Sequence, residues 1–480
     1  MKKIIMSSYY TLLTILFLLI ITLVLTGCGN NSGDGYEPPE FVYLPEVIPL
    51  PMPEGVSWID NVTISGDSVY FTAMAEGDAN NTFTSYDIYT MDLDGSNSRA
   101  LPEYSIGTEI PEEATDGNIQ IYSICIDSSG YIWIAERGEF FYFPDGLDED
   151  DWERWNKRIM VKDFTRVRKL ADTGAEVLSF DVSHITAGQD WFYISAFIVD
   201  DNNNIYIGDD SQVYVFDNEG KAVFTLDAQW VERFIKMQDG SIANSGWGNR
   251  GKELTKIDVV GKKWGETINL PSNAHNIYRG NEEYTILFTD GNGLYGIEEA
   301  SGEVTMLLNW IDSDITTDGL GSITFLPDER ILITSQTWNN DRQVQEIIFL
   351  SKTPYSELPE RSVLTLATFY LDFNIRSTVV QFNRTSTTHR IRVTDYSEFN
   401  TDDDVQAGLT RLSTEIVSGN VPDILDVSNL PFTQYAAKGL LLDLYPLIDS
   451  DPVFDRSDFM ESAFRATEIN GGLYKIFPYF

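Results

Sequence analysis

Six side chains in the last quarter of the chain could together bind a small ligand. Each follows the end of an expected strand: Tyr370 and Asp372 the first, Tyr396 and Ser397 the second, Ser428 and Asn429 the third. Aromatic rings stack on apolar ligand faces, and carboxylate, amide and hydroxyl groups hydrogen-bond to polar ligand atoms. Open α/β sheets bind ligands at the carboxyl ends of their strands. The six positions therefore predict a ligand-binding edge, although each residue taken singly is more often structural.

Catalytic motifs are missing from the sequence. Its three histidines, at positions 184, 275 and 389, stand in unrelated contexts, and it contains no G-x-S-x-G, no H-E-x-x-H and no paired cysteines. The segment from Asp200 to Asn204 has the oxygen ligands that Ca²⁺ prefers, but a polar hairpin turn is the favoured interpretation. We therefore expect no catalytic residue, no metal and no cofactor, and we do not expect an enzyme.

The elements that must position the six side chains form a parallel α/β unit. Residues 362–367 and 390–396 alternate like strands, and a short apolar run follows Pro422. Amphipathic helices are indicated after the first two strands, around 375–382 and 405–416. A further helix is expected from Pro431 to a left-handed cap at Gly439. Strand, helix, strand, helix, strand is the order of a parallel sheet.

The same stretch carries a family resemblance. Asn420 to Ile448, NVPDILDVSNLPFTQYAAKGLLLDLYPLI, and the downstream GGLYKIFP resemble the sugar-type extracellular solute-binding proteins of bacterial ABC importers. The resemblance implies that residues 362–480, after a linker at 355–361, form the N-terminal lobe of a periplasmic-binding-protein fold. It also implies an oligosaccharide ligand and ABC permease subunits as partners. Because that family crosses into a second lobe where this sequence stops, the lobe is expected to be incomplete.

The N-terminus reads as a lipoprotein signal. Lys2 and Lys3 precede an apolar run at residues 10–24, and Leu25-Thr26-Gly27-Cys28 follows as a lipobox. The alternative is an uncleaved anchor helix. The lipobox, with a flexible linker over residues 29–42, predicts that Cys28 carries lipid, including palmitate-type acyl chains, and holds the protein on the outer face of the cell membrane.

Charge and cysteine content narrow the possible partners. The formal charge is −41, from 74 acidic and 33 basic side chains, which argues against binding to nucleic acid and against electrostatic docking on anionic lipid. Cys125 lies in an apolar strand-like run and has no partner, so we predict a buried thiol and no disulfide.

The long middle of the chain, residues 43–354, predicts a β-propeller. Apolar and polar residues alternate in short runs, and Gly220, Gly261 and Gly302 mark similar turns at spacings of 41 residues. A second class of turn interleaves with these, for example at 127–134. Two hairpins per repeat of this length are typical of four-stranded blades. We expect about six blades, at Val62–Leu101, Ile119–Thr186, Ile194–Leu226, Val231–Leu270, Ile277–Leu308 and Ile323–Leu350. The alternative is a β-sandwich.

The family resemblance implies a surface-anchored substrate-binding component of an ABC importer, and two other functions remain open beside it. The propeller could be the working part of a surface sensor or interaction lipoprotein. It could also be an enzyme of the lactonase or lyase kind, which tightly bound metal would favour.

The lipobox yields a direct test. Replacing Cys28 by Ala removes the thiol that receives diacylglycerol, so the variant should lose both acyl labelling and signal-peptidase II processing. Metabolic labelling with a radioactive fatty acid, followed by gel analysis, checks this. Acyl label retained in the Cys28→Ala protein would contradict the lipoprotein assignment.

Overall fold

The computed structural model describes residues 39–75, 83–144, 157–185, 193–248, 251–298, 301–317, 319–339, 342–401, 403–453 and 455–476. The predicted signal segment, Cys28 and most of the linker lie outside these residues. The chain divides into two compact units, residues 41–354 and residues 355 onward, the second grouped with the N-terminal segment up to Glu40. In the described ranges, no helix has both the length and the apolar character needed to cross a membrane.

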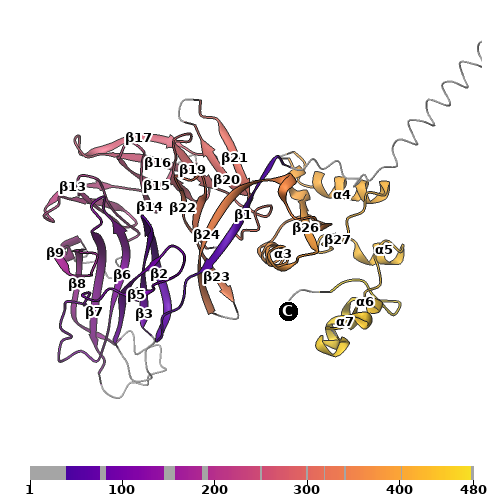
Figure 1. Ribbon diagram of the computed structural model, residues 1–480, viewed down its shortest axis with the longest axis horizontal. Helices are drawn as coiled ribbons and strands as arrows, with labels where there is room; N and C mark the ends of the chain where they lie inside the picture. Colours follow the sequence, from indigo (N-terminus) through magenta and orange to yellow (C-terminus); the bar gives the residue numbers. More distant parts are fainter. Residues whose placement is uncertain are drawn as a thin grey trace, which may run out of the picture. The chain divides into compact units, whose positions relative to one another are not determined.

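The first unit consists almost entirely of β-sheet (Figure 1). Four sheets have four antiparallel strands each. The first contains β10 (Ala196–Val199), β11 (Ile205–Gly208), β12 (Gln212–Phe216) and β13 (Ala222–Asp227), and the second contains β14 (Arg233–Lys236), β15 (Ile242–Gly248), β16 (Gly251–Asp258) and β17 (Lys263–Asn269). The third contains β18 (Ile277–Arg279), β19 (Ile286–Thr289), β20 (Gly293–Ile297) and β21 (Val304–Asn309). The fourth contains β22 (Leu320–Phe325), β23 (Ile331–Asn339), β24 (Arg342–Pro354) and, as its outer strand, β1 (Phe41–Pro49).

A fifth sheet contains eight strands. They are β2 (Val56–Ser65), β3 (Ser68–Ala75), β4 (Phe83–Asp92), β5 (Arg99–Ala100), β6 (Asp116–Ile126), β7 (Ile132–Tyr142), β8 (Ile159–Leu170) and β9 (Glu176–Asp181), followed by the 3₁₀ turn η1 (Ser183–Ile185). Two antiparallel meanders, β2 to β5 and β6 to β9, meet in this sheet through a short parallel pairing of β4 with β6.

The leading strands of successive meanders contact one another in order. Strand β6 contacts both β2 and β10, β14 contacts both β10 and β18, and β18 contacts β22. The circuit returns to its start because β24 contacts β2. This propeller-like arrangement of four-stranded blades confirms the predicted mainly-β propeller and rules out the sandwich alternative.

The two predicted turn classes occupy distinct places in the blades. Turns such as 127–131 join the first strand of a blade to the second, and turns such as 217–221 join the third to the fourth. In an antiparallel meander these two connections lie at the same end of the sheet. The less regular connections, between second and third strands and between blades, therefore lie at the opposite end of the ring.

Aspartate side chains fix several of these turns. Asp127 accepts hydrogen bonds from the backbone N–H groups of Ser129 and Tyr131, at 2.9 and 3.0 Å, and from the Trp133 indole at 2.9 Å. Asp200 repeats the pattern with Asn202, Asn204 and the Tyr206 hydroxyl. The residue three places after each Asp, Gly130 or Asn203, has a positive φ, which Gly and Asn tolerate.

Apolar side chains fill the spaces between neighbouring sheets. One cluster joins Trp133 and Val167 to Ile205 and Phe216 of the next blade, and all four side chains are less than 2% exposed. Equivalent clusters recur around the ring. Both faces of each blade are thereby covered, because a blade packs on the blade before it and the blade after it.

Strand β1 closes the ring. It pairs antiparallel with β24 over nine residue pairs, from Phe41 with Pro354 to Pro49 with Glu346. The last blade thus takes its outer strand from the start of the unit. The predicted blade Ile323–Leu350 lacked this strand, although the alternating run at Phe41–Pro49 was a visible signal for it.

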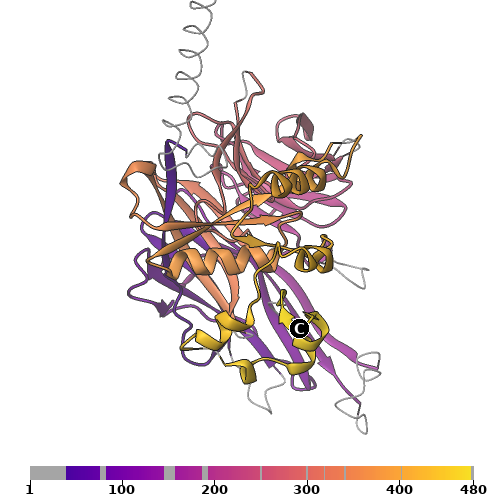
Figure 2. The same cartoon turned by 90° about the vertical axis from the view of Figure 1, so that its right-hand side faces the viewer.

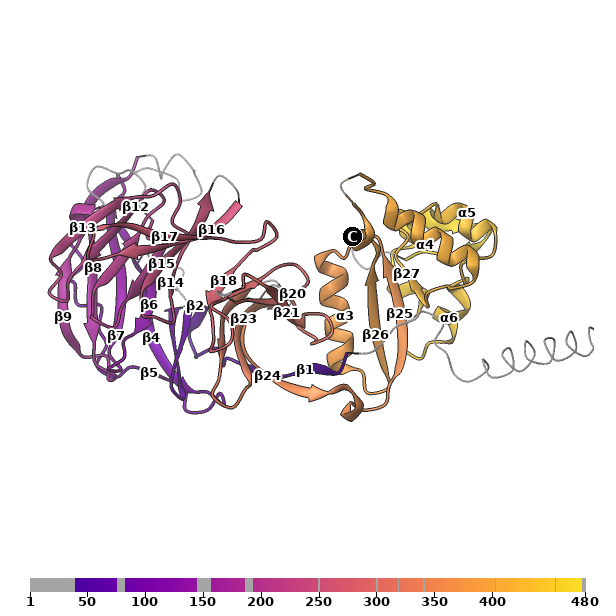
Figure 3. The ribbon, with the colours of Figure 1, turned by 90° about the horizontal axis from the view of Figure 1, so that it is seen from above.

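The second unit contains a small parallel sheet. The central strand β25 (Ser362–Thr368) pairs with β26 (His389–Asp395) and with the two-residue β27 (Ile424–Leu425). Figure 3 shows α3 (Phe373–Thr385) and α4 (Ala407–Ser418) on opposite sides of this sheet. Figure 2 looks onto the unit with α6 and α7 in yellow. The remaining elements are η2 (Tyr355–Glu357), η3 (Tyr396–Phe399), α5 (Phe432–Ala437), α6 (Tyr445–Ser450), η4 (Arg456–Asp458), α7 (Glu461–Thr467), β28 (Glu468–Ile469) and β29 (Gly472–Leu473).

The prediction that the second unit is a lobe of a periplasmic-binding-protein fold needs correction. The GGLYKIFP segment at 471–478, which the family resemblance implies is a further strand of the lobe, does not join the parallel sheet within the described residues, because β29 pairs there with β28 alone. Asn470 and Gly471 both have positive φ and form a tight hairpin, as an Asn-Gly pair favours. This turn reverses the chain where the prediction required an extended strand. The structure therefore gives a three-stranded unit and no support for that lobe.

Ring closure by β1 can be tested with two fragments of the chain. A fragment of residues 36–354 should fold alone, give a β-type circular dichroism spectrum and melt cooperatively, because both partners of the closing pair are present. A fragment of residues 51–354 lacks β1 and leaves β24 as an open edge, so its melting temperature should fall by several degrees or its transition should broaden. Identical melting of the two fragments would show that closure contributes nothing.

Candidate functional site

A polar pocket lies among the leading strands of the propeller-like unit. Its volume is about 330 Å³, within the order of roughly 300–1,000 Å³ that small-ligand sites have. It is lined by Asp60, Asn61 and Val62 of β2, Arg233 of β14, Gly319, Gly321 and Ser322 at the start of β22, Thr334, Ser335 and Gln336 of β23, and Gln345 of β24. Arg233 and Ser322 stand at the beginnings of their strands, so the pocket lies at the ring end opposite the regular hairpin turns.

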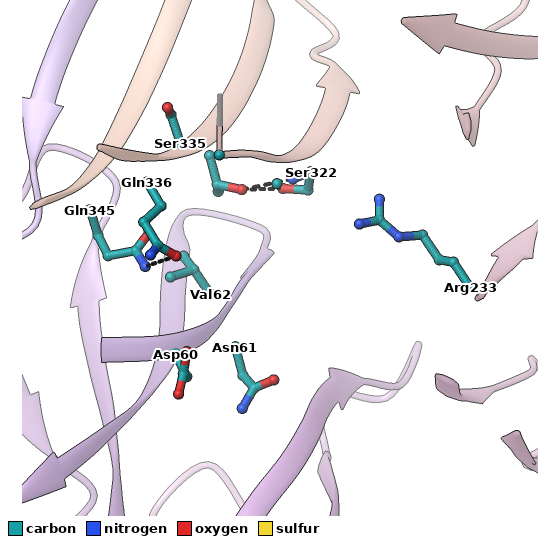
Figure 4. A pocket seen from close by; sticks show the side chains of 11 residues that line it. Asp60, Asn61, Val62, Arg233, Ser322, Ser335, Gln336 and Gln345 are labelled. Carbon is teal, nitrogen blue, oxygen red and sulfur yellow. Dashed lines mark hydrogen bonds between the residues drawn. The ribbon is translucent and has the colours of Figure 1, made fainter. Parts of the chain in front are cut away.

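Arg233 is the positively charged residue in the lining. Its side chain is exposed, and its guanidinium lies over the ring of Tyr278, 5.7 Å from the ring centroid. Among the described residues it makes no ion pair. Figure 4 shows Arg233 reaching into the pocket from the side opposite Gln336 and Gln345.

Neutral hydrogen-bonding groups form the wall opposite Arg233. The hydroxyls of Ser322 and Thr334 are 3.0 Å apart, and Gln345 donates to the Gln336 side chain at 3.3 Å. Gln345 also donates to the backbone oxygen of Ile59 at 3.2 Å, which ties the last blade to β2. The hydroxyl of Ser335 is buried and has no hydrogen-bond partner in the described part of the chain. A buried unpartnered hydroxyl is unfavourable unless water or a ligand satisfies it.

Asp60 supplies a carboxyl group to the same pocket. Burial raises the pKa of Asp60 above its ordinary value, and hydrogen bonds with Trp58 and Tyr86 offset only part of this effect. The same carboxylate contributes, after burial, to raising the pKa of the Tyr86 hydroxyl. Asp60 therefore takes up a proton more readily than an exposed aspartate does.

Asn61 sits at a bulge that shapes the pocket. The register of β2 against β3 shifts between Asp60 and Thr63, and Asn61 has a φ of 50°. Its side-chain amide donates to Thr72 at 3.0 Å and to the backbone oxygen of Ile121 in β6 at 2.9 Å. Bulges and left-handed residues re-aim neighbouring side chains and concentrate at functional sites. The amide bonds hold this bulge between two meanders.

The six side chains predicted to bind ligand lie in the second unit at the carboxyl ends of its strands. Tyr370, Ser428 and Asn429 are exposed there. Asp372 caps α3 by accepting from the Ile375 N–H at 3.0 Å, and Ser397 donates to Asp395 at 2.7 Å. Tyr396 is 7% exposed, and its hydroxyl donates to Glu415.

Two carboxylates bring these loops together. Asp395 accepts from the Leu371 N–H, and Asp426 accepts from the Thr368 hydroxyl, both at 2.9 Å. Tyr370, Ser428 and Asn429 remain free to meet a ligand, whereas Asp372, Tyr396 and Ser397 have structural partners. That any of the six binds ligand stays a prediction.

Sequence reasoning missed every residue of the pocket in the propeller. Asp60, Arg233 and Gln345 come from three distant parts of the chain, and no local motif connects them. The only available signal was topological, since residues at the starts of leading strands in a propeller converge on its axis.

Two other candidate groups proved to be structural. The Asp200 carboxylate is engaged by its own hairpin, as the polar-turn interpretation predicts, and the described residues contain no group of three or more His, Cys, Asp or Glu side chains arranged for a metal. Burial raises the pKa of the Cys125 thiol to about 12, so this half-buried thiol is a weak nucleophile at neutral pH.

Comparisons with known proteins show only distant similarities. No family model and no curated protein matches the chain. A Trypanosoma rangeli sialidase in complex with sialic acid is 12% identical with a TM-score of 0.37, over 61% of this chain and 54% of the sialidase. The Hadza microbial sialidase Hz136 is 9% identical with a TM-score of 0.35, over 64% of this chain and 66% of that one.

A third solved structure is the extracellular domain of BT4673 from B. thetaiotaomicron, a proposed one-component system. It is 13% identical with a TM-score of 0.30, over 68% of this chain and 44% of that one. The chain thus spans about half of the length of the first sialidase, 54%. Similarities this low carry no argument about activity.

These comparisons overturn the predicted family. None of the three structures is a solute-binding protein, and no family model supports that assignment. The prediction of a sugar-type ABC solute-binding protein is therefore wrong. Its basis was the order of strands and helices between 362 and 448, and that order forms a parallel α/β unit in many unrelated folds.

The raised pKa of Asp60 predicts a pH-dependent effect on stability. An Asp with an ordinary pKa of 3.8 in the unfolded chain and a higher pKa in the folded protein favours folding most below pH 3.8. This contribution is lost as the pH rises through the folded pKa. Asp60→Asn removes the titration, so its free energy of unfolding relative to wild type should increase as the pH rises.

Urea unfolding at a series of pH values measures this difference. Asp67→Asn, at the exposed turn between β2 and β3, is the matched control and should show no such trend. Parallel stability curves for wild type and Asp60→Asn would refute the burial of this carboxyl.

Proposed function

We propose that this chain is a surface-anchored lipoprotein whose β-propeller is a binding module, acting as a sensor or interaction protein. The observation that carries the proposal is the polar pocket, in which side chains from β2, from β14 and from the β22–β24 sheet converge. Ligand sites form where a few polar groups meet in a concave region.

The architecture supports a binding role. We treat the two meanders of the eight-stranded sheet as separate blades beside the four four-stranded sheets. Propeller blades pack as nearly rigid layers around an axis, so groups from several blades keep a fixed separation. A ligand held between Arg233 and Ser322 would connect β14 with β22, which belong to different blades. Occupancy could then be transmitted through the ring, as a sensor requires.

The proposed location follows from the N-terminal sequence. Lipidation at Cys28 would tether the protein to the outer face of the membrane. The expected linker end at residue 42 is wrong, because Phe41 and Val42 belong to β1. The sequence before β1 contains Gly, Asn and Ser, a composition that would let the propeller reorient. The net charge of −41 keeps the protein away from anionic lipid surfaces.

Catalysis is a second candidate function, of the lactonase or lyase kind. The observation in its favour is Asp60, whose raised pKa suits a general acid or base and whose position is in the pocket. A binding protein and an enzyme differ in what happens to the bound ligand. A binding protein releases its ligand unchanged, whereas an enzyme converts it and loses turnover in Asp60→Asn.

Blocking the pocket tests the binding role. Ser322→Trp places an indole in the pocket, so any ligand found for the wild type by thermal-shift screening of saccharides, organic acids and peptides should no longer stabilise the variant. Ser179→Trp, on the exposed outer strand β9, is the matched control and should respond as wild type.

The outcomes separate the candidates. If Ser322→Trp loses the response and Ser179→Trp keeps it, the result supports binding in the polar pocket. An unchanged response in Ser322→Trp would place binding elsewhere, and chemical conversion of the ligand, detected by mass spectrometry, would favour the enzyme.

A further inference from the structure

We propose that the polar pocket lined by Asp60, Arg233 and Ser322, which we call the axial pocket, selects a small polyhydroxylated ligand that carries one carboxylate. This carboxylate pairs with Arg233. The inference rests on the proposed binding function and specifies its ligand class.

The first argument is the state of Arg233. Several arginines of the propeller have carboxylate partners, for example Arg137 with Glu139 at 2.8 Å and Arg330 with Asp328 at 2.8 Å. Arg233 has none among the described residues, although the chain carries 74 acidic side chains against 33 basic ones. Its guanidinium lies 5.7 Å from the centroid of the Tyr278 ring and also interacts with the Tyr278 hydroxyl. A guanidinium has five N–H donors, and its planar fork matches a carboxylate with two parallel hydrogen bonds.

The second argument is the chemistry of the facing wall. It offers hydroxyls from Ser322, Thr334 and Ser335, and amides from Gln336 and Gln345 (Figure 4). These neutral groups both donate and accept, as sugar hydroxyls require. A pocket of about 330 Å³ suits a ligand of monosaccharide size.

The third argument is charge balance. The lining contains one guanidinium and one carboxyl, that of Asp60. A monoanion would be neutralised by Arg233, and the lining adds one carboxyl group, that of Asp60, whose burial disfavours its charged form. A dianionic phosphate would leave excess negative charge beside that carboxyl, which is costly in a partly buried site. The charges therefore favour a carboxylate over a phosphate.

Isothermal titration calorimetry on the full-length chain in detergent tests the proposal. The probes are D-glucuronate, D-glucose and glucose 6-phosphate. Glucuronate should bind more tightly than glucose, and its affinity should fall with added salt. Arg233→Gln should weaken glucuronate roughly tenfold or more, since a charge-assisted hydrogen bond is lost, and should leave glucose unchanged. Arg233→Lys should restore part of the affinity.

The matched control is Arg279→Gln, which removes an exposed arginine from the neighbouring strand β18 outside the pocket. It should bind glucuronate as wild type does. Circular dichroism melting of each variant confirms that it is folded.

Three results would overturn the proposal: equal affinity of wild type and Arg233→Gln for glucuronate, tighter binding of glucose 6-phosphate than of glucuronate, or no heat with glucuronate at about 10 mM, above the millimolar range of weak binding. If glucose and glucuronate bind equally and both are lost in Ser322→Trp, the axial binding function stands and only the carboxylate preference fails.

Discussion

The pairing of β1 with β24 is the constraint on which the rest of the propeller depends. The last blade has its full set of four strands only because the first strand of the unit supplies the outer one, and this pairing joins the two ends of the ring. The pocket depends on the same closure. Gln345 of β24 bonds to Ile59 of β2, so the wall that includes Gln336 and Gln345 is held against β2 only when the ends of the ring meet.

Closure also explains the contrast between the two ends of the blades. At one end, aspartates such as Asp127 and Asp200 hold short turns through backbone hydrogen bonds, and these turns need nothing from neighbouring blades. At the other end the connections are irregular, and polar side chains there are satisfied by adjacent blades, as Asn61 is by Ile121. At the regular end, turns are stabilised by hydrogen bonds within their own short sequence. The irregular end can therefore vary in sequence and form a ligand-binding site.

Sequence periodicity predicted the blades well because each blade is a local structure. The predicted blades Ile194–Leu226 and Val231–Leu270 nearly coincide with β10 to β13 and with β14 to β17. The signals that predict a blade, alternating residues and turns with Gly or Asn, all lie within about 40 consecutive residues. The pocket could not be predicted in this way, because Asp60, Arg233 and Gln345 meet only through ring closure. The family assignment failed for the opposite reason. Its local elements, such as β25 and α3, are present, but the Asn470–Gly471 turn changes the topology that follows.

The closing pair has a mechanical consequence. Phe41, where the chain enters the ring, and Pro354, where it leaves, are paired with each other, and the Tyr355 N–H donates to the Glu40 oxygen just outside them at 3.0 Å. Tension applied between the chain before Phe41 and the chain after Pro354 would therefore act on one residue pair at a time, beginning at Phe41 and Pro354. Antiparallel strands pulled from a shared end unzip in sequence and do not share the force. Stretching would thus open this seam before it strained any other blade.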